Sequence, residues 1–188
     1  MKLSDYRACH THDEFVSLTD KEINYACRHA RKMRNVSLAK GDRERKAAIN
    51  VTGERIQMLG AVAELAARKH FGFPMVLRAQ NYREPDLPHQ VEVKMIGADH
   101  FGLRVYERTK DNRRVMAVVI PKGCERVPYR LPGWIYAADA KREGWLIDPN
   151  NKGPMYAVPQ DALIPLSDLR DILQAEGWNA LPRPLGDV

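Results

Sequence analysis

The residues best suited to chemistry lie between Asp86 and Lys94, where two carboxylates and one ammonium group fall within a short stretch. Polar and apolar residues alternate over 91–96, which is the spacing of a β-strand. Glu92 and Lys94 then share the face turned away from the apolar core. Asp86 joins them if the chain turns back after Pro88. Two carboxylates beside an amine predict a site for a hard cation and a water molecule, and hence metal-assisted hydrolysis.

Hydrolysis of a phosphodiester needs an in-line water, neutralisation of developing negative charge and a stabilised leaving oxygen, most of which Mg²⁺ supplies. Asp86 and Glu92 have the chemistry to hold the ion, and the backbone carbonyl of Val93 is placed to add a ligand. Lys94 is suited to orient or deprotonate the water and to stabilise negative charge. The alternative is a solvated strand on which Glu92 pairs with Lys94 or Arg83.

A helix over about residues 51–70 must position a further carboxylate, because Glu64 interrupts an otherwise apolar run. A buried anion needs a partner, and two are available. One is Arg68, a turn further along the same helix. The other is the cation expected at Asp86 and Glu92, and we favour this second interpretation because the downstream motif is present.

Two more helices and a hairpin are expected around this region. The first helix runs from about 21 to 34 after a cap at Thr19 or Asp20, and the last runs over 168–176, between a cap at Ser167 and Gly177. Strands over 102–108 and 114–120 are expected to form a hairpin around 110–112. The continuous apolar run at 115–120 predicts a central strand that is buried on both faces.

The chain has 188 residues, a formal net charge of +6 and a pI near 9.3, which favours a polyanionic partner over an inert basic surface. Basic residues concentrate within 28–46 and recur at 104 and 108, and these residues could bind a phosphate backbone. The simpler interpretations are a solvated helix face for the first group and exposed side chains of a strand for the second. The residues concerned are Arg28, Arg31, Lys32, Arg34, Lys40, Arg43, Arg45 and Lys46, with Arg104 and Arg108 further on.

Cysteine usage and hydropathy predict the compartment. Three cysteines cannot all pair, so we expect no disulfide framework and a reducing cytoplasm. The N-terminal residues carry no apolar run typical of a signal peptide, and no stretch approaches the length of a membrane span. A membrane partner is therefore not expected.

The candidate residues together resemble the PD-(D/E)xK nuclease superfamily. The resemblance rests on a glutamate-bearing helix, then Pro85-Asp86, then Glu92-Val93-Lys94. It implies that Glu64, Asp86 and Glu92 bind the catalytic metal and that Lys94 is essential to the chemistry. The stretch Gly60–Ala66 resembles the corresponding helix of phage and prophage members, and parts of 132–169 resemble uncharacterised phage-borne relatives, so the likeness spans roughly 45–170.

This resemblance implies an α/β (α+β) fold with a central mixed β-sheet flanked by helices, a restriction-endonuclease-like core and a helical N-terminal region. One nuclease-like domain over 1–188 is expected, made of a basic helical region at 1–50, a catalytic core at 51–125 and C-terminal strands and a helix at 126–188. The expected activity is Mg²⁺-dependent endonucleolytic hydrolysis of DNA, with Mn²⁺ as a substitute, RNA left open, and a homodimer compatible with cutting two strands. If the chain is phage-encoded, it would act in the host cytoplasm. A catalytically silent nucleic-acid-binding module and an accessory protein that binds an acidic partner are the alternatives.

Overall fold

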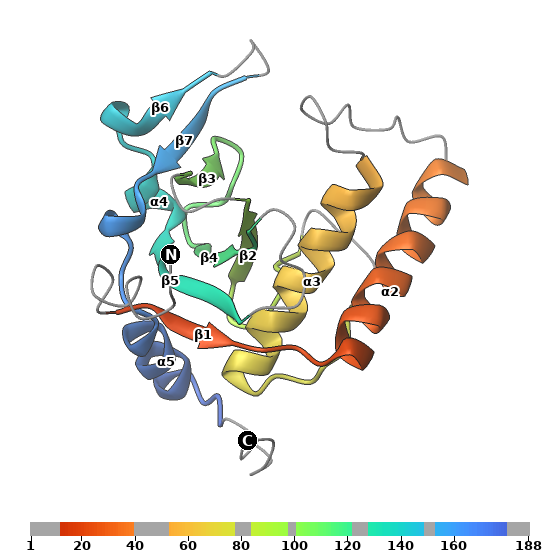
Figure 1. The fold of residues 1–188 in the computed structure, drawn as a ribbon. Helices are drawn as coiled ribbons and strands as arrows, with labels where there is room; N and C mark the ends of the chain where they lie inside the picture. Colours follow the sequence, from red (N-terminus) through yellow and green to blue (C-terminus); the bar gives the residue numbers. More distant parts are fainter. Residues whose placement is uncertain are drawn as a thin grey trace.

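A computed structural model of the chain describes residues 12–39, 53–77, 84–97, 101–121, 128–148 and 153–179. Within these residues the fold is of mixed α and β type, with two sheets and helices packed around them (Figure 1). The elements follow the chain in this order: β1 (Glu14–Val16), α2 (Asp20–Ala39), α3 (Gly53–Phe71), β2 (Val91–Ile96), β3 (Leu103–Tyr106), β4 (Arg114–Val119), β5 (Tyr129–Tyr136), α4 (Ala137–Ala140), the 3₁₀ turn η1 (Glu143–Trp145), β6 (Leu146–Ile147), β7 (Met155–Val158), the 3₁₀ turn η3 (Gln160–Ala162) and α5 (Leu166–Ala175).

The main sheet has the strand order β1-β5-β4-β2. It is mixed, because β2 runs parallel to β4 whereas β4, β5 and β1 pair antiparallel. The predicted mixed sheet flanked by helices is thus confirmed. The strand expected at 91–96 is β2, and it lies at an edge of this sheet. An edge position leaves one side of its backbone turned away from the sheet.

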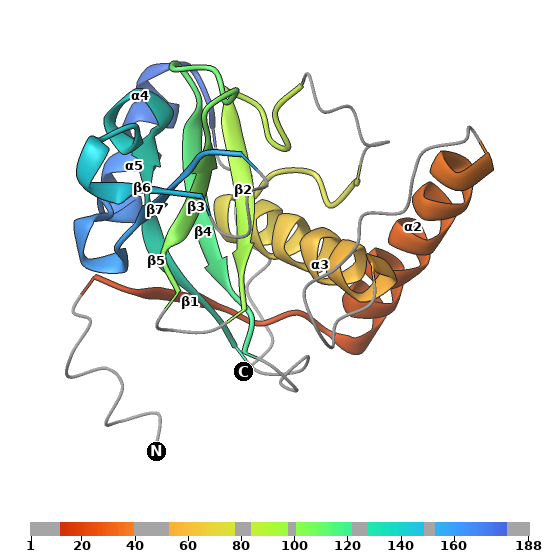
Figure 2. The same ribbon diagram turned by 90° about the horizontal axis from the view of Figure 1, so that it is seen from above.

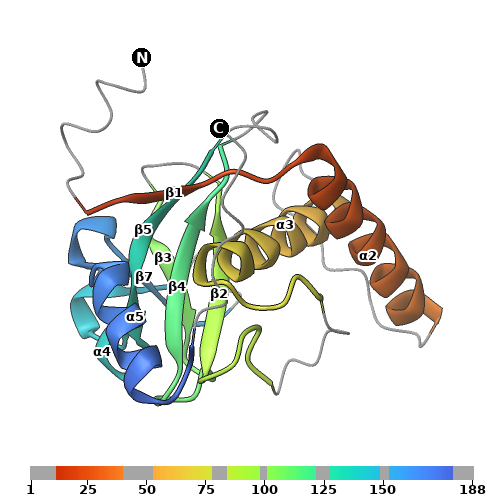
Figure 3. The same cartoon turned by 90° about the horizontal axis from the view of Figure 1, so that it is seen from below.

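The sheet separates two apolar cores (Figure 2). On one face, α3 and α5 cover β2, β4 and β5, with Leu65, Met116 and Trp134 among the buried side chains. On the other face, β3, β7 and α4 cover the same sheet, and Val105 and Ala117 are buried there. The central strand β4 is therefore buried on both faces, as its apolar run predicts. Figure 3 shows α3 and α5 on their shared side of the sheet.

The expected hairpin of 102–108 with 114–120 is wrong. β3 pairs antiparallel with β7 in a second sheet of order β3-β7-β6, whereas β4 pairs with β2 and β5. Leu103 and Val105 point into the second core, so β3 packs face to face against the main sheet instead of extending it. Alternation predicts the strand correctly but does not determine its neighbour.

Several helix ends lie where their sequence signals place them, although α2 continues to Ala39, past its expected end at about 34. Thr19 and Glu22 form a capping box at the start of α2, since the Glu22 amide donates to the Thr19 hydroxyl and the Glu22 carboxylate accepts from the Thr19 amide. Gly177, at φ +84°, ends α5 as expected. Ser167 does not cap α5, because the helix already begins at Leu166. Among the described residues, no helix has both the length and the apolar character that crossing a bilayer requires.

Candidate active site at the outer edge of β2

The two functional side chains of β2 lie on the face opposite α3. In the parallel register, Glu92 is paired with Val115 and Lys94 with Ala117, and both partners are buried in the second core. Val93 and Met95 point instead toward α3. The expected alternation of β2 is therefore confirmed. Glu92 and Lys94 are partly buried and form an ion pair through Oε1 and Nζ.

Asp86 is folded back onto the same strand. Its Oδ2 accepts a hydrogen bond of 2.8 Å from the amide of Val93. The amide of Arg114 on β4 donates to the carbonyl of Gln90, just before β2, and the amide of Ile120, just after β4, donates to the carbonyl of Ile96. The backbone groups of the even-numbered residues of β2 therefore face β4, and those of the odd-numbered residues face outward. The Val93 carbonyl thus lies on the same outer side as the amide that Asp86 binds.

A tight turn brings Asp86 to this position. The Leu87 amide donates to the Val91 carbonyl at 3.0 Å, and the two turn residues His89 and Gln90 have φ of +57° and +60°. Left-handed backbone is uncommon outside glycine and costs about 1 kcal/mol or more per residue. A structure that keeps two such residues in succession must hold the turn from outside.

Arg114 and Glu176 supply contacts that hold the turn. Arg114 Nη1 donates to the His89 carbonyl at 2.7 Å and to Glu176 Oε2 at 2.8 Å, and the His89 ring nitrogen Nδ1 lies 3.1 Å from the same carboxylate oxygen. The Arg114 hydrogen bonds lower the pKa of Glu176 below its ordinary value, although partial burial opposes this. Sequence reasoning missed this group, because 62 residues separate Arg114 from Glu176 and neither belongs to a recognisable motif.

Burial is the main influence on the charge of Asp86. It raises the pKa of Asp86 above its ordinary value, despite the hydrogen bond from Val93 and the positive charge of Lys94, and the negative charge of Glu92 adds to the rise. Arg113, which is buried and precedes β4, lowers the pKa of Asp86. A carboxylate whose charge is destabilised in this way is one that a bound cation would stabilise.

Glu64 is not gathered with the other two carboxylates. Its Oε1 lies 3.0 Å from Arg68 Nε, so the pairing within the helix is present. The helix that carries Glu64, α3, packs on the face of β2 opposite the one that bears Glu92 and Lys94. In the described part of the chain, no three His, Cys, Asp or Glu side chains lie close enough together to hold a metal ion. The expected convergence of Glu64, Asp86 and Glu92 is therefore not found there.

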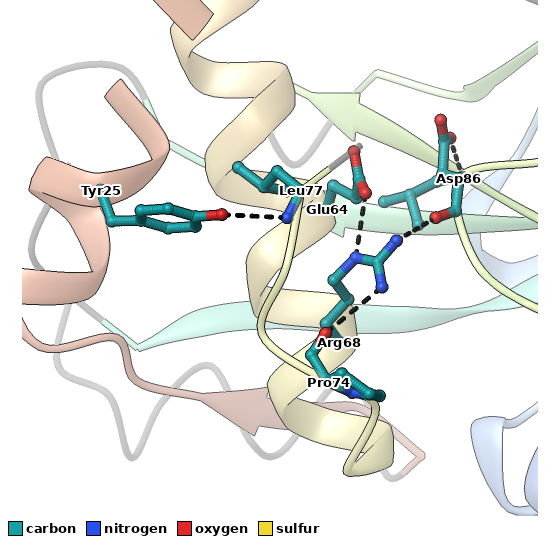
Figure 4. Close-up of polar contacts among 7 residues, drawn as sticks. Tyr25, Glu64, Arg68, Pro74, Leu77 and Asp86 are labelled. Carbon is teal, nitrogen blue, oxygen red and sulfur yellow. Dashed lines mark hydrogen bonds and ion pairs between the residues drawn. The ribbon is translucent and has the colours of Figure 1, made fainter. Parts of the chain in front are cut away.

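Arg68 links the Glu64 carboxylate to the Asp86 segment (Figure 4). Its Nη2 donates to the Asp86 carbonyl at 2.6 Å and its Nη1 to the Pro74 carbonyl at 3.3 Å. The Arg68 residue is only 4% exposed. Sequence reasoning considered it only as an ion-pair partner, and no pattern indicates that it contacts Asp86.

The predicted nucleic-acid-binding residues come from two separate layers. Arg28, Arg31 and Lys32 are exposed on α2, whereas Arg34 is partly buried. Two of these guanidinium groups face Glu54 of α3, at 3.0 Å for Arg31 and 3.9 Å for Arg34. Lys40, Arg43, Arg45 and Lys46 lie outside the described residues.

The remaining two predicted arginines belong to β3 and the turn after it, on the other side of the main sheet. Arg104 and Arg108 are exposed, and the Arg108 guanidinium lies 5.5 Å from the centre of the Tyr106 ring. Arg104 and Tyr106 share the outer face of β3, because Leu103 and Val105 point into the core. This surface is on the same side of the main sheet as Glu92 and Lys94.

Comparisons of the chain with protein-family models, curated proteins and solved structures found no match. The function proposed next therefore rests on the residues themselves.

Proposed function

We propose that the protein is a metal-dependent nuclease that hydrolyses phosphodiester bonds in DNA, with a site of the PD-(D/E)xK type on a restriction-endonuclease-like core. The observation that carries this proposal is the return of Asp86 to the outer edge of β2, where its carboxylate meets the backbone of Val93 next to Glu92 and Lys94. The carboxylate from the turn, the acid of the strand and the lysine of the strand are the groups that metal-assisted hydrolysis would use, and this supports the proposal.

The donor set fits Mg²⁺, with Mn²⁺ as a substitute. Asp86 and Glu92 offer carboxylate oxygens and Val93 offers an outward-facing carbonyl, which are the hard oxygen ligands that Mg²⁺ prefers. In its buried position, the charge of the Asp86 carboxylate is not fully compensated by the neighbouring cations. When bound, Mg²⁺ would lower the pKa of a water molecule and neutralise charge on the phosphate.

The side chains of the strand would handle the proton and the developing charge. Lys94 lies against the Glu92 carboxylate, so its ammonium group is held at the edge where phosphate would arrive. From that position it stabilises negative charge on the phosphoryl oxygens or orients the attacking water. Arg104 and Arg108, on the same side of the main sheet, would bind backbone phosphates of the DNA, and Arg28, Arg31 and Lys32 would extend that contact from α2.

The ion pair between Glu92 and Lys94 also favours a second candidate, a nucleic-acid-binding module without cleavage. In that case the two side chains neutralise one another on a solvated strand, and the basic residues alone account for DNA binding. The two candidates differ in their response to metal and to the loss of Glu92.

The test is incubation of the purified chain with plasmid, linear and branched DNA in Mg²⁺, Mn²⁺ or EDTA. A nuclease cuts only with metal, and Glu92→Gln or Lys94→Ala lowers the rate by about a hundredfold or more. Glu143→Gln, which removes a carboxylate from an exposed position in η1, serves as the matched control and should cut like the wild type. Salt-sensitive binding without cutting, unchanged by Glu92→Gln, would support the silent module instead.

A further inference from the structure

The contacts of Arg68 give Glu64 a role other than binding metal. Arg68 and Arg113 are both buried near the candidate site, each with 4% of its surface exposed. The Arg68 guanidinium donates hydrogen bonds to three groups: Glu64 Oε1 on its own helix, the Pro74 carbonyl just after the helix and the Asp86 carbonyl. A guanidinium suits this task because its donors form a fixed planar fork.

The contact with Asp86 is made by the backbone, not by the carboxylate. The Asp86 carbonyl points toward Arg68 (Figure 4), while the Asp86 side chain accepts a hydrogen bond from the Val93 amide. Arg68 therefore leaves the carboxylate available to its other partners and fixes only the place of the residue. This is the geometry of a positioning residue.

Glu64 completes the arrangement by compensating the charge of Arg68. A buried guanidinium without a carboxylate partner would be costly, and Glu64 supplies that partner at 3.0 Å from its own helix. Glu64 also restrains Nε, which orients the two Nη groups toward Pro74 and Asp86. The segment that follows α3 is also held by α2, because the hydroxyl of Tyr25 on α2 accepts a hydrogen bond of 3.2 Å from the Leu77 amide.

We propose that Glu64 acts on the hydrolytic site through Arg68, as part of a Glu64–Arg68 pair that positions Asp86, and that it does not bind the metal ion. This inference rests on the proposed nuclease function for its consequence in catalysis. Its structural part does not, because the position of Asp86 at Val93 can be measured without metal or DNA.

The structural test is hydrogen exchange of individual backbone amides by NMR, in EDTA. The Val93 amide is protected by Asp86, whereas the amides of Glu92 and Lys94 face β4. Arg68→Lys keeps a positive charge but loses the planar fork, so exchange at Val93 should rise about tenfold relative to Glu92 and Lys94. Glu64→Gln, which leaves Arg68 in place, should raise the exchange of the same amide by a smaller factor and covers the case in which Arg68→Lys does not fold.

Lys69→Ala is the matched control. Lys69 is the next residue of α3 and pairs with Glu22 of α2 at 2.9 Å, so its loss removes an ion pair of α3 without touching Asp86. Exchange at Val93 should be unchanged in this variant. Equal exchange at Val93 in wild type, Arg68→Lys and Glu64→Gln would overturn the positioning role.

The catalytic part is tested by the Mn²⁺ affinity, measured by calorimetry. If the pair positions Asp86, then Glu64→Gln and Arg68→Lys each weaken Mn²⁺ binding by about tenfold or more. The double variant should then bind Mn²⁺ as weakly as the more impaired of the two single variants, and no more weakly. If Glu64 binds the ion, Glu64→Gln weakens binding and Arg68→Lys does not, which overturns the proposal. Absence of Mn²⁺ binding and of cleavage in the wild type would refute the nuclease function, while the exchange result would still decide the role of Arg68.

Discussion

Replacing Asp86 by asparagine should stabilise the metal-free protein. Burial raises the pKa of Asp86, so the folded protein holds the Asp86 proton more tightly than the unfolded chain does. Above the folded-state pKa, the ionised carboxylate therefore costs stability. That cost disappears as the pH falls through the raised pKa toward the ordinary value of about 3.9. The amide introduced by Asp86→Asn would remove the charge and keep an oxygen to accept the hydrogen bond from the Val93 amide.

The expected gain follows from what the substitution keeps and what it removes. The hydrogen bond of 2.8 Å to Val93 survives with a neutral acceptor, at a loss of about 0.5–1 kcal/mol. Burial, the largest influence on the Asp86 charge, and repulsion by Glu92 are both relieved. We expect a net gain of about 0.5–2 kcal/mol in the free energy of unfolding at pH 7, which raises Tm by about 2–4 °C per kcal/mol for a chain of this size.

Thermal unfolding in EDTA, followed by circular dichroism at several pH values, measures this difference. The advantage of Asp86→Asn should shrink as the pH falls from 7 to 4. Saturating Mg²⁺ should reverse it by stabilising only the wild type, by about 2.7 kcal/mol at a hundred times Kd. Asp161→Asn, at an exposed carboxylate in η3, should change stability by less than about 0.5 kcal/mol. An Asp86→Asn protein that is less stable than the wild type at pH 7 in EDTA would refute the reasoning, because the carboxylate would then be a stabilising charge.

Three further predictions concern the packing of β5, the turn beside the site and the DNA interface. Gly133→Ala should lower the free energy of unfolding by about 3 kcal/mol in urea titrations, because a Cβ at this φ of +144° would lie 2.3 Å from the Ile164 carbonyl oxygen; a change below about 1 kcal/mol would contradict this. Glu176→Gln should cost about 0.5–1 kcal/mol at pH 7. Because the pKa of Glu176 is lowered by Arg114, the wild-type advantage is present above the ordinary carboxyl pKa and is lost as the pH falls through the folded value; an advantage that persists at pH 2 would count against it. Arg28→Ala should reduce the slope of log affinity for DNA against log salt by about 1, measured by fluorescence anisotropy, and an unchanged slope would remove α2 from the interface.

The sequence predicts those parts of the fold that depend on local signals. Alternation around Glu92 places β2 over 91–96, as observed, and the unbroken apolar run after Arg114 predicts a strand that is buried on both faces. Thr19 marks the start of α2, and Gly177 marks the end of α5. Each of these features is decided by the side chains of the element itself.

Features that depend on distant partners were not predictable in the same way. The pattern of β3 is that of a strand with one buried face, and it fits pairing with β4 as well as with β7. The turn at His89 and Gln90 contains no glycine or asparagine to indicate left-handed backbone.

The environment of Glu64 is a further case. The sequence offers both Arg68 and a cation as partners for this carboxylate. The contact with Arg68, and the reach of Arg68 to the Asp86 carbonyl, emerge only in three dimensions.

The most direct test of the site is to map where a divalent ion binds. Substoichiometric Mn²⁺ added to ¹⁵N-labelled protein broadens the NMR signals of amides close to the ion. If Asp86, Val93 and Glu92 hold the ion, their signals and those of their immediate neighbours should disappear first, and Asp86→Asn should abolish the effect at the same Mn²⁺ concentration. Broadening centred on another surface, or the same pattern in Asp86→Asn, would contradict a metal site at the outer edge of β2.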